Sequence, residues 1–221
     1  MPDFTTFRGQ NDVLHNPLAL SYYEPQTNKS LCQLHIIRSI NQQFRRCMST
    51  TAPAAPKSDD PADVLANRTR VVVTDRSLLS PLAFVESAYA QGSIGAFARD
   101  FLLEETLQMA RHTLKETGFS EGYSGIFFMQ EEAETCMERV RKRARPYELA
   151  SLDVECLNRL SAHYEVYLNW YKTPTGGEFY RGGEHGIRLG RRNSLKELYE
   201  FIENLVEAKK PQQQQQQQQQ E

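Results

Sequence analysis

The chain has 221 residues, which is enough for one sizeable domain with tails and short for two. Hydrophobic residues make up 39% of it, charged residues make up 24%, and the formal net charge is -2. This balance disfavours a globally basic nucleic-acid-binding protein and an acidic disordered chain. No apolar run approaches the roughly 20 residues of a membrane-spanning helix, and the chain does not begin with a secretory signal. We therefore expect an intracellular protein, located in the cytoplasm.

Two short apolar runs predict strands. The first covers residues 70–75 and is β-branched, and the second covers residues 125–130 and follows a glycine-rich turn. Because neither run alternates polar and apolar residues, we expect both strands to be buried, with helices on both faces of a parallel sheet.

Three stretches predict helices. Apolar residues recur at helical spacing over residues 97–114 and again over residues 152–170. Near the end of the chain, Ser194 and Glu197 form a capping box, which predicts a helix from about Leu195 to Val206. Helices that alternate with strands indicate an α/β fold.

Three segments of biased composition interrupt or follow these elements. Residues 49–66 are rich in Pro, Ala, Ser and Thr, which predicts a flexible insertion. Residues 176–186 are rich in glycine, and we expect a surface insertion there as well. Residues 208–221 contain a glutamine run, which predicts a disordered tail.

Four arginines fall at alternate positions after the second predicted strand, within a predicted helix. They are Arg139, Arg141, Arg143 and Arg145. Alternation spreads the four guanidinium groups around a helix, so one or two of them must face inward or overhang a site. The planar guanidinium group suits phosphate because it donates bidentate hydrogen bonds and stays charged. The alternative is a solvated basic face, stabilised by Glu134 and Glu138 one turn away. A nuclear-targeting or RNA-binding patch is disfavoured because aromatic residues do not interleave with the arginines.

A polar triplet, Asp75-Arg76-Ser77, follows the first predicted strand. Ligands of open parallel sheets bind beyond the carboxyl ends of the strands, so this triplet stands where a site is expected. Asp75 could hold Mg²⁺ through oxygen, and Arg76 could neutralise a transferring phosphoryl group. The alternative is an ion pair that closes the strand.

The order of these pieces resembles the deoxyribonucleoside kinase family, which includes deoxycytidine, deoxyguanosine and mitochondrial thymidine kinases. The resemblance rests on the triplet and Phe84-Val-Glu86, on Ile126-Phe-Phe-Met with the arginine segment, and on a weaker upstream match. The upstream residues are Leu18, Leu20, Tyr22, Glu24, Pro25 and Gln33. The family implies a P-loop-kinase-like α/β fold, a parallel sheet flanked by helices. Residues 1–48 would then be an N-terminal remnant with the substrate-side helix, and residues 67–207 the remainder of the kinase domain with its lid.

The resemblance also implies roles for individual residues. Gln33 would recognise the nucleobase edge through its amide donor and acceptor, and Tyr22 and Glu148 would bind the 3′-hydroxyl of the deoxyribose. Asp75 would help to hold Mg²⁺, and Arg76 would lie near the attacked 5′-oxygen. The four arginines would form a lid over the nucleotide phosphates. The alternative for Tyr22 and Gln33 is a surface turn and an amide on the outside of a helix.

The activity implied is transfer of the γ-phosphoryl group of ATP to the 5′-hydroxyl of a deoxynucleoside, with Mg²⁺. The implied partners are a deoxynucleoside substrate and, for a complete chain, a second copy in a homodimer, with neither nucleic acid nor membrane. A mitochondrial location is the alternative, because residues 25–58 contain no acidic residue and several basic ones. The internal position of that segment argues against a transit peptide.

The sequence departs from the family in one respect that concerns catalysis. No G-x-x-x-x-G-K-[ST] motif occurs in it, and Pro2 or Asp3 stands where the family has its catalytic Glu. We expect the first strand, the P-loop and the second strand to be missing, so that the two apolar strands share no neighbour. An incomplete gene model would explain this, and the alternative is a truncated, non-catalytic homologue that binds a full-length kinase. In either case we expect that this chain does not phosphorylate deoxynucleosides.

Overall fold

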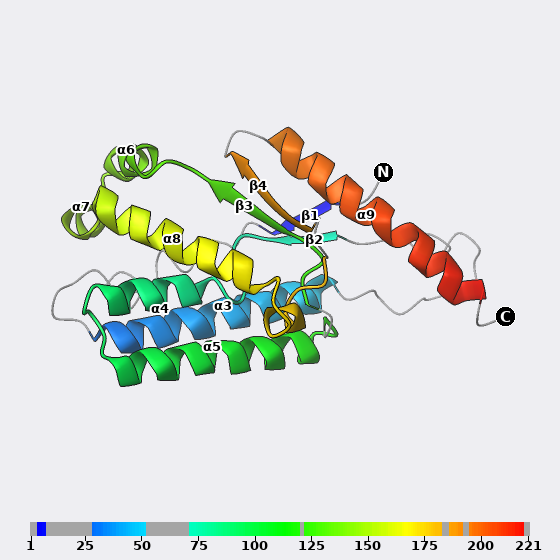
Figure 1. Ribbon diagram of the computed structural model, residues 1–221, viewed down its shortest axis with the longest axis horizontal. Helices are drawn as coiled ribbons and strands as arrows, with labels where there is room; N and C mark the ends of the chain where they lie inside the picture. Colours follow the sequence, from blue (N-terminus) through cyan, green and yellow to red (C-terminus); the bar gives the residue numbers. More distant parts are fainter. Residues whose placement is uncertain are drawn as a thin grey trace. The chain divides into compact units, whose positions relative to one another are not determined.

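The computed structural model describes residues 4–7, 28–51, 71–119, 122–182, 186–191 and 195–218 (Figure 1). The chain divides into two compact units, Met1–Gly118 and Phe119–Glu221, each of which combines a parallel strand pair with helices. The boundary falls inside residues 67–207, which we expected to form one part. Among the described helices, none is long and apolar enough to cross a membrane.

The first unit contains a parallel pair of strands. Strand β1 (Phe4–Phe7) pairs with β2 (Val71–Thr74), and Phe4 stands opposite Val71. The strand predicted at residues 70–75 is confirmed, although its residues are half-buried and not fully buried. Strand β1 was not predicted. Its Phe-Thr-Thr-Phe sequence consists of aromatic and β-branched residues, which favour a strand once a partner edge is present.

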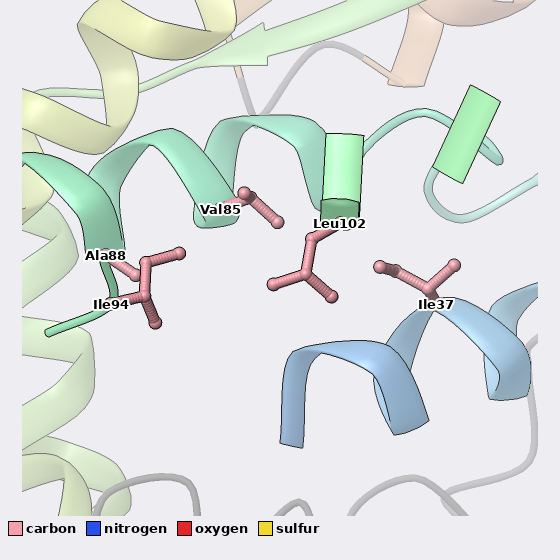
Figure 2. Close-up of a cluster of buried hydrophobic side chains, with 5 residues drawn as sticks. All are labelled: Ile37, Val85, Ala88, Ile94 and Leu102. Atoms are coloured by element: carbon pink, nitrogen blue, oxygen red, sulfur yellow. The ribbon is translucent and has the colours of Figure 1, made fainter. Parts of the chain in front are cut away.

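Three helices pack together in the first unit: α3 (Lys29–Thr51), α4 (Pro81–Ala90) and α5 (Ala96–Glu116). Helix α5 confirms the helix predicted over residues 97–114. Figure 2 shows side chains from all three helices and from the α4–α5 turn in one apolar cluster. The cluster consists of Ile37, Val85, Ala88, Ile94 and Leu102. Burying the Ile, Val and Leu side chains stabilises each by about 1.5–3 kcal/mol relative to exposure, so this cluster fixes the helices to one another.

The second unit also contains a parallel pair, β3 (Ile126–Gln130) with β4 (Ile187–Arg191). Helix α8 (Val154–Trp170) packs Tyr164 against Phe128, and α9 (Leu195–Gln218) packs Phe201 against Phe127. Neighbouring strand residues point to opposite faces, so the two helices cover opposite faces of the pair. The strand predicted at residues 125–130 is confirmed, but its burial is not, since its first three residues are half-buried and Met129 and Gln130 are exposed. Among the described residues, no strand pairs with both β2 and β3.

Two short helical elements precede α8. Helix α6 (Ala133–Arg143) is followed by Ala144, which has a left-handed φ of 53°, and then by α7 (Pro146–Ser151). Helix α8 confirms the helix predicted over residues 152–170 and begins after Asp153. The carboxylate of Asp153 accepts a hydrogen bond from the amide of Cys156 at 2.6 Å, and this bond lowers the pKa of Asp153.

The glycine-rich segment is not a surface insertion, as far as it is described. It contains a 3-10 turn at Gly176–Glu178, followed by Phe179, whose exposed fraction is 0%. Phe179 packs against Trp170, and a Cβ atom at Gly176 would lie 2.0 Å from the carbonyl oxygen of Trp170. The glycine therefore permits close packing in the interior, which composition alone did not reveal.

The described elements extend into both segments for which disorder or flexibility was predicted. Helix α3 continues to Thr51, and the rest of residues 49–66 lies outside the described residues. Helix α9 starts at Leu195, as predicted, but continues past Val206 to Gln218. Glutamine has a high helix propensity, which favours this continuation.

Candidate functional site

Gln33 lies on α3 in the first unit, and its exposed fraction is 0%. This burial excludes the alternative in which it is an amide on the outside of a helix. A buried amide is costly to desolvate unless it is hydrogen-bonded, so this position suits a side chain that makes specific polar contacts. Tyr22, the other residue of the upstream match, lies outside the described residues.

The triplet at the carboxyl end of β2 has an unusual backbone. Arg76 has a left-handed φ of 76°, a conformation that non-glycine residues rarely adopt. Its guanidinium carbon lies 5.6 Å from the centre of the Phe84 ring on α4, a cation–π contact. Asp75 and Arg76, both described, form no ion pair with each other, so the alternative of an ion pair that closes the strand is wrong. Strained backbone of this kind is concentrated at functional sites.

Helix α4, which carries Phe84, is joined to α5 by a two-pronged ion pair. Nε and Nη2 of Arg99 donate to the two carboxylate oxygens of Glu86 at 2.7 and 2.6 Å. The guanidinium carbon of Arg99 also lies 5.2 Å from the ring centre of Tyr89. The hydrogen bonds to Glu86 raise the pKa of Arg99, which is thus fixed as a cation. Sequence analysis quoted Phe84 and Glu86 as a motif without assigning these contacts to them.

Asp75 is the carboxylate proposed to hold Mg²⁺, and its side chain is exposed at the end of β2. Among the described residues, no cluster of three or more His, Cys, Asp or Glu side chains could form a protein-only metal site. Mg²⁺ commonly takes one or two protein carboxylates and completes its shell with water and substrate phosphates. A single exposed Asp75 therefore suits Mg²⁺ that arrives with a nucleotide.

In the second unit, the four arginines of the predicted lid have different surroundings. Arg139 is paired with Glu131, which lies between β3 and α6. Arg143 and Arg145 both approach Glu148. Arg141 is exposed and forms no ion pair with any residue in the described part of the chain. The arginines thus do not form a uniform solvated face.

Glu134 and Glu138, which we expected to stabilise such a face, form no ion pair with the four arginines; all of these residues are described. Instead, the acidic partners come from either end of α6. Helix α6 ends at Arg143, and the chain then turns through Ala144, so that the following residues fold back. A pairing across a turn is not visible in helical spacing, which explains why it was missed.

Glu148 is the most buried of these acidic residues. Its side chain is 8% exposed, in the first turn of α7. Oε1 accepts a hydrogen bond from Nη1 of Arg145 at 3.1 Å, and Oε2 lies 3.1 Å from Nη2 of Arg143. A buried carboxylate needs such cations, because desolvation strongly disfavours an unpaired charge. The structure therefore brings together three of the predicted site residues, Glu148 with Arg143 and Arg145.

A family model described as deoxynucleoside kinase matches residues 3–180, most of the chain. No curated protein matches the sequence to a significant degree. The matched range includes every residue that the resemblance assigned to a site, in both units. Two small parallel strand pairs with many helices are consistent with the α/β kinase-like fold of that family. The chain belongs to the deoxynucleoside kinase family.

Proposed function

We propose that this protein binds a deoxynucleoside at the site in which the deoxynucleoside kinase family transfers a phosphoryl group to the 5′-hydroxyl. The observation that carries the proposal is Glu148, a carboxylate that is 8% exposed and held between two arginines within the family match. A nearly buried carboxylate held between two arginines is a strong acceptor for a sugar hydroxyl.

Gln33 recognises the base in this proposal. Its complete burial supports the assignment, because a buried amide discriminates between bases that pair with its donor and acceptor and bases that do not. Tyr22 is the second residue proposed for the deoxyribose, together with Glu148.

In this proposal, Arg76 and Asp75 lie at the 5′-hydroxyl end of the nucleoside. The guanidinium of Arg76, oriented by its left-handed backbone and the Phe84 ring, lies ready to stabilise negative charge at the 5′-oxygen. Asp75 holds Mg²⁺, which neutralises charge on nucleotide phosphates when bound. Arginines of the lid segment supply further positive charge for those phosphates.

Isothermal titration calorimetry of the full chain with the four common deoxynucleosides tests the proposal. We expect at least one to bind, and Gln33→Met, which keeps the shape but removes the amide, to weaken binding by about ten-fold or more. Gln42→Leu is the matched control, since Gln42 is an exposed glutamine on the same helix, and it should leave the affinity unchanged. If none of the four binds, the proposed function is wrong.

A further inference from the structure

The four arginines of the lid segment differ in their carboxylate partners. Arg139 is paired with Glu131, and Arg145 donates a hydrogen bond to Glu148. Arg141 is exposed without an ion pair in the described part of the chain. These surroundings argue against one shared role in binding phosphate.

Arg145 and Glu148 are close in sequence and locked together by the fold. Arg145 precedes the first residue of α7 and is 28% exposed, and its Nη1 meets Oε1 of Glu148 at 3.1 Å. Moving Arg145 to a phosphate would leave a nearly buried carboxylate without its hydrogen-bonded cation, which is strongly unfavourable. Arg145 is therefore held in place by the residue that it neutralises.

The two oxygens of Glu148 differ as well. Oε1 accepts the hydrogen bond from Arg145, whereas Oε2 is buried and has no hydrogen bond of acceptable geometry in the described part of the chain. Arg143 lies 3.1 Å from Oε2 as an ion-pair partner only, and its side chain is 51% exposed. A buried acceptor of this kind is expected to have a partner in the functional state. A hydroxyl donor can supply that hydrogen bond when Arg143 moves aside.

We propose that Arg145 is a positioning residue for Glu148 and does not bind phosphate, and that Oε2 of Glu148 is the oxygen that accepts the 3′-hydroxyl. This inference rests on the proposed function, because it assigns parts within the same deoxynucleoside site. Arg141, whose charge has no ion-pair partner in the described part of the chain, is then the arginine of this segment that contributes most to phosphate binding. Arg143 can pair either with Glu148 or with a phosphate.

Two ligands separate these roles in calorimetry on the full chain: a deoxynucleoside and inorganic tripolyphosphate. We expect Arg145→Gln to weaken deoxynucleoside binding by about ten-fold and to change tripolyphosphate affinity by less than about two-fold. Arg141→Gln should weaken tripolyphosphate binding and leave the deoxynucleoside affinity nearly unchanged. The loss caused by Arg145→Gln should vanish for the matching 2′,3′-dideoxynucleoside, which has no 3′-hydroxyl. If Arg145 gave structural support only, Arg145→Gln would weaken the binding of the deoxynucleoside and of the dideoxynucleoside equally.

Two further variants guard against simple unfolding. Arg145→Lys keeps the positive charge and should recover part of the deoxynucleoside affinity. The double variant Arg145→Gln, Glu148→Gln leaves no unpaired buried charge, and it should bind the deoxynucleoside and the dideoxynucleoside equally. Circular dichroism of each variant measures whether it is folded.

The possible failures are distinct. If the wild-type chain binds no deoxynucleoside, the proposed function fails and the inference fails with it. If the wild-type chain binds a deoxynucleoside but Arg145→Gln weakens tripolyphosphate binding as much as Arg141→Gln does, the inference alone is wrong. The inference alone is also wrong if the loss in Arg145→Gln persists with the dideoxynucleoside.

Discussion

Thr113 on α5 donates its hydroxyl hydrogen to Oδ1 of Asn41 on α3 across 2.8 Å, and both side chains are buried. Nδ2 of Asn41 donates in turn to the carbonyl oxygen of Ile37 at 2.9 Å, and Nε of Arg45 donates to Thr113 Oγ1 at 3.2 Å. The resulting chain of hydrogen bonds joins α5 to the helix that carries Gln33. It thus holds the proposed base-recognising residue on a fixed support.

Replacing Thr113 by Val should destabilise the protein by about 1–3 kcal/mol, because Oδ1 of Asn41 loses its donor in the interior. The matched control is Thr106→Val, at a second buried threonine of α5 whose hydroxyl donates to the carbonyl oxygen of Leu102 in its own helix. Urea unfolding should show a clearly smaller loss of unfolding free energy for Thr106→Val than for Thr113→Val. Equal losses would mean that the hydrogen bond between α3 and α5 stabilises the protein no more than a bond within one helix.

The left-handed backbone at Arg76 predicts an unusual mutational pattern. A left-handed conformation costs an L-residue about 1–2 kcal/mol, whereas glycine adopts it freely. We therefore expect Arg76→Gly to be more stable to urea than Arg76→Ala by about 1 kcal/mol, the reverse of the usual order for these two residues. If Arg76→Ala is the more stable variant, the backbone there is not strained.

We also predict that the chain as it stands transfers no phosphoryl group. ATP labelled in its γ-phosphate is incubated with each deoxynucleoside and Mg²⁺, and labelled monophosphate is measured. The expected yield equals that of the Arg76→Gly variant, which serves as the blank, because a phosphate-binding P-loop motif does not occur in the sequence. Turnover well above that blank would show that other residues replace the motif.

Tyr180 predicts how stability responds to alkaline pH. Burial raises its pKa to about 12, above its usual value near 10. Above pH 10 the unfolded chain loses this proton while the folded chain keeps it, so the free energy of unfolding falls as pH rises. This contribution of Tyr180 stops changing near pH 12, where the folded chain loses the proton as well. The loss is of the order of 2 kcal/mol.

Tyr180→Phe removes the titrating group, and this contribution to the pH dependence should disappear. Urea unfolding of both proteins at several pH values between 9 and 12 measures the difference. Parallel stability curves for the two proteins would show that Tyr180 does not titrate in the folded state as described.

The long periodic helices and the apolar strands could be predicted from sequence. Helices α5 and α8 and strands β2 and β3 lie where apolar periodicity and β-branched runs place them. Strand β4 was missed because Arg188 and Gly190 interrupt its apolar pattern. A Cβ atom at Gly190 would lie 2.1 Å from the Phe127 ring, so packing against a neighbouring strand selects that glycine. A contact of this type cannot be inferred from local sequence.

The candidate site was predictable as a set of residues but not as a set of contacts. Motif order identified Gln33, Asp75, Arg76 and the arginine segment. The pairing of Glu131 with Arg139, and the contact between Phe84 and Arg76, depend on how the chain turns after each element. Propensity and spacing describe single elements, so these contacts became visible only in the folded chain.

The mutual dependence of Arg145 and Glu148 has a consequence for sequence variation among relatives. Loss of Glu148 alone leaves the guanidinium of Arg145 without its carboxylate, and loss of Arg145 alone leaves the nearly buried carboxylate with only the more exposed Arg143 as an ion-pair partner in the described part of the chain; loss of both removes both charges. A lineage should therefore retain the pair or exchange it as a unit, through short-lived intermediates with reduced stability. The two positions are expected to covary, while the exposed position of Arg141 drifts independently of them unless phosphate binding constrains it.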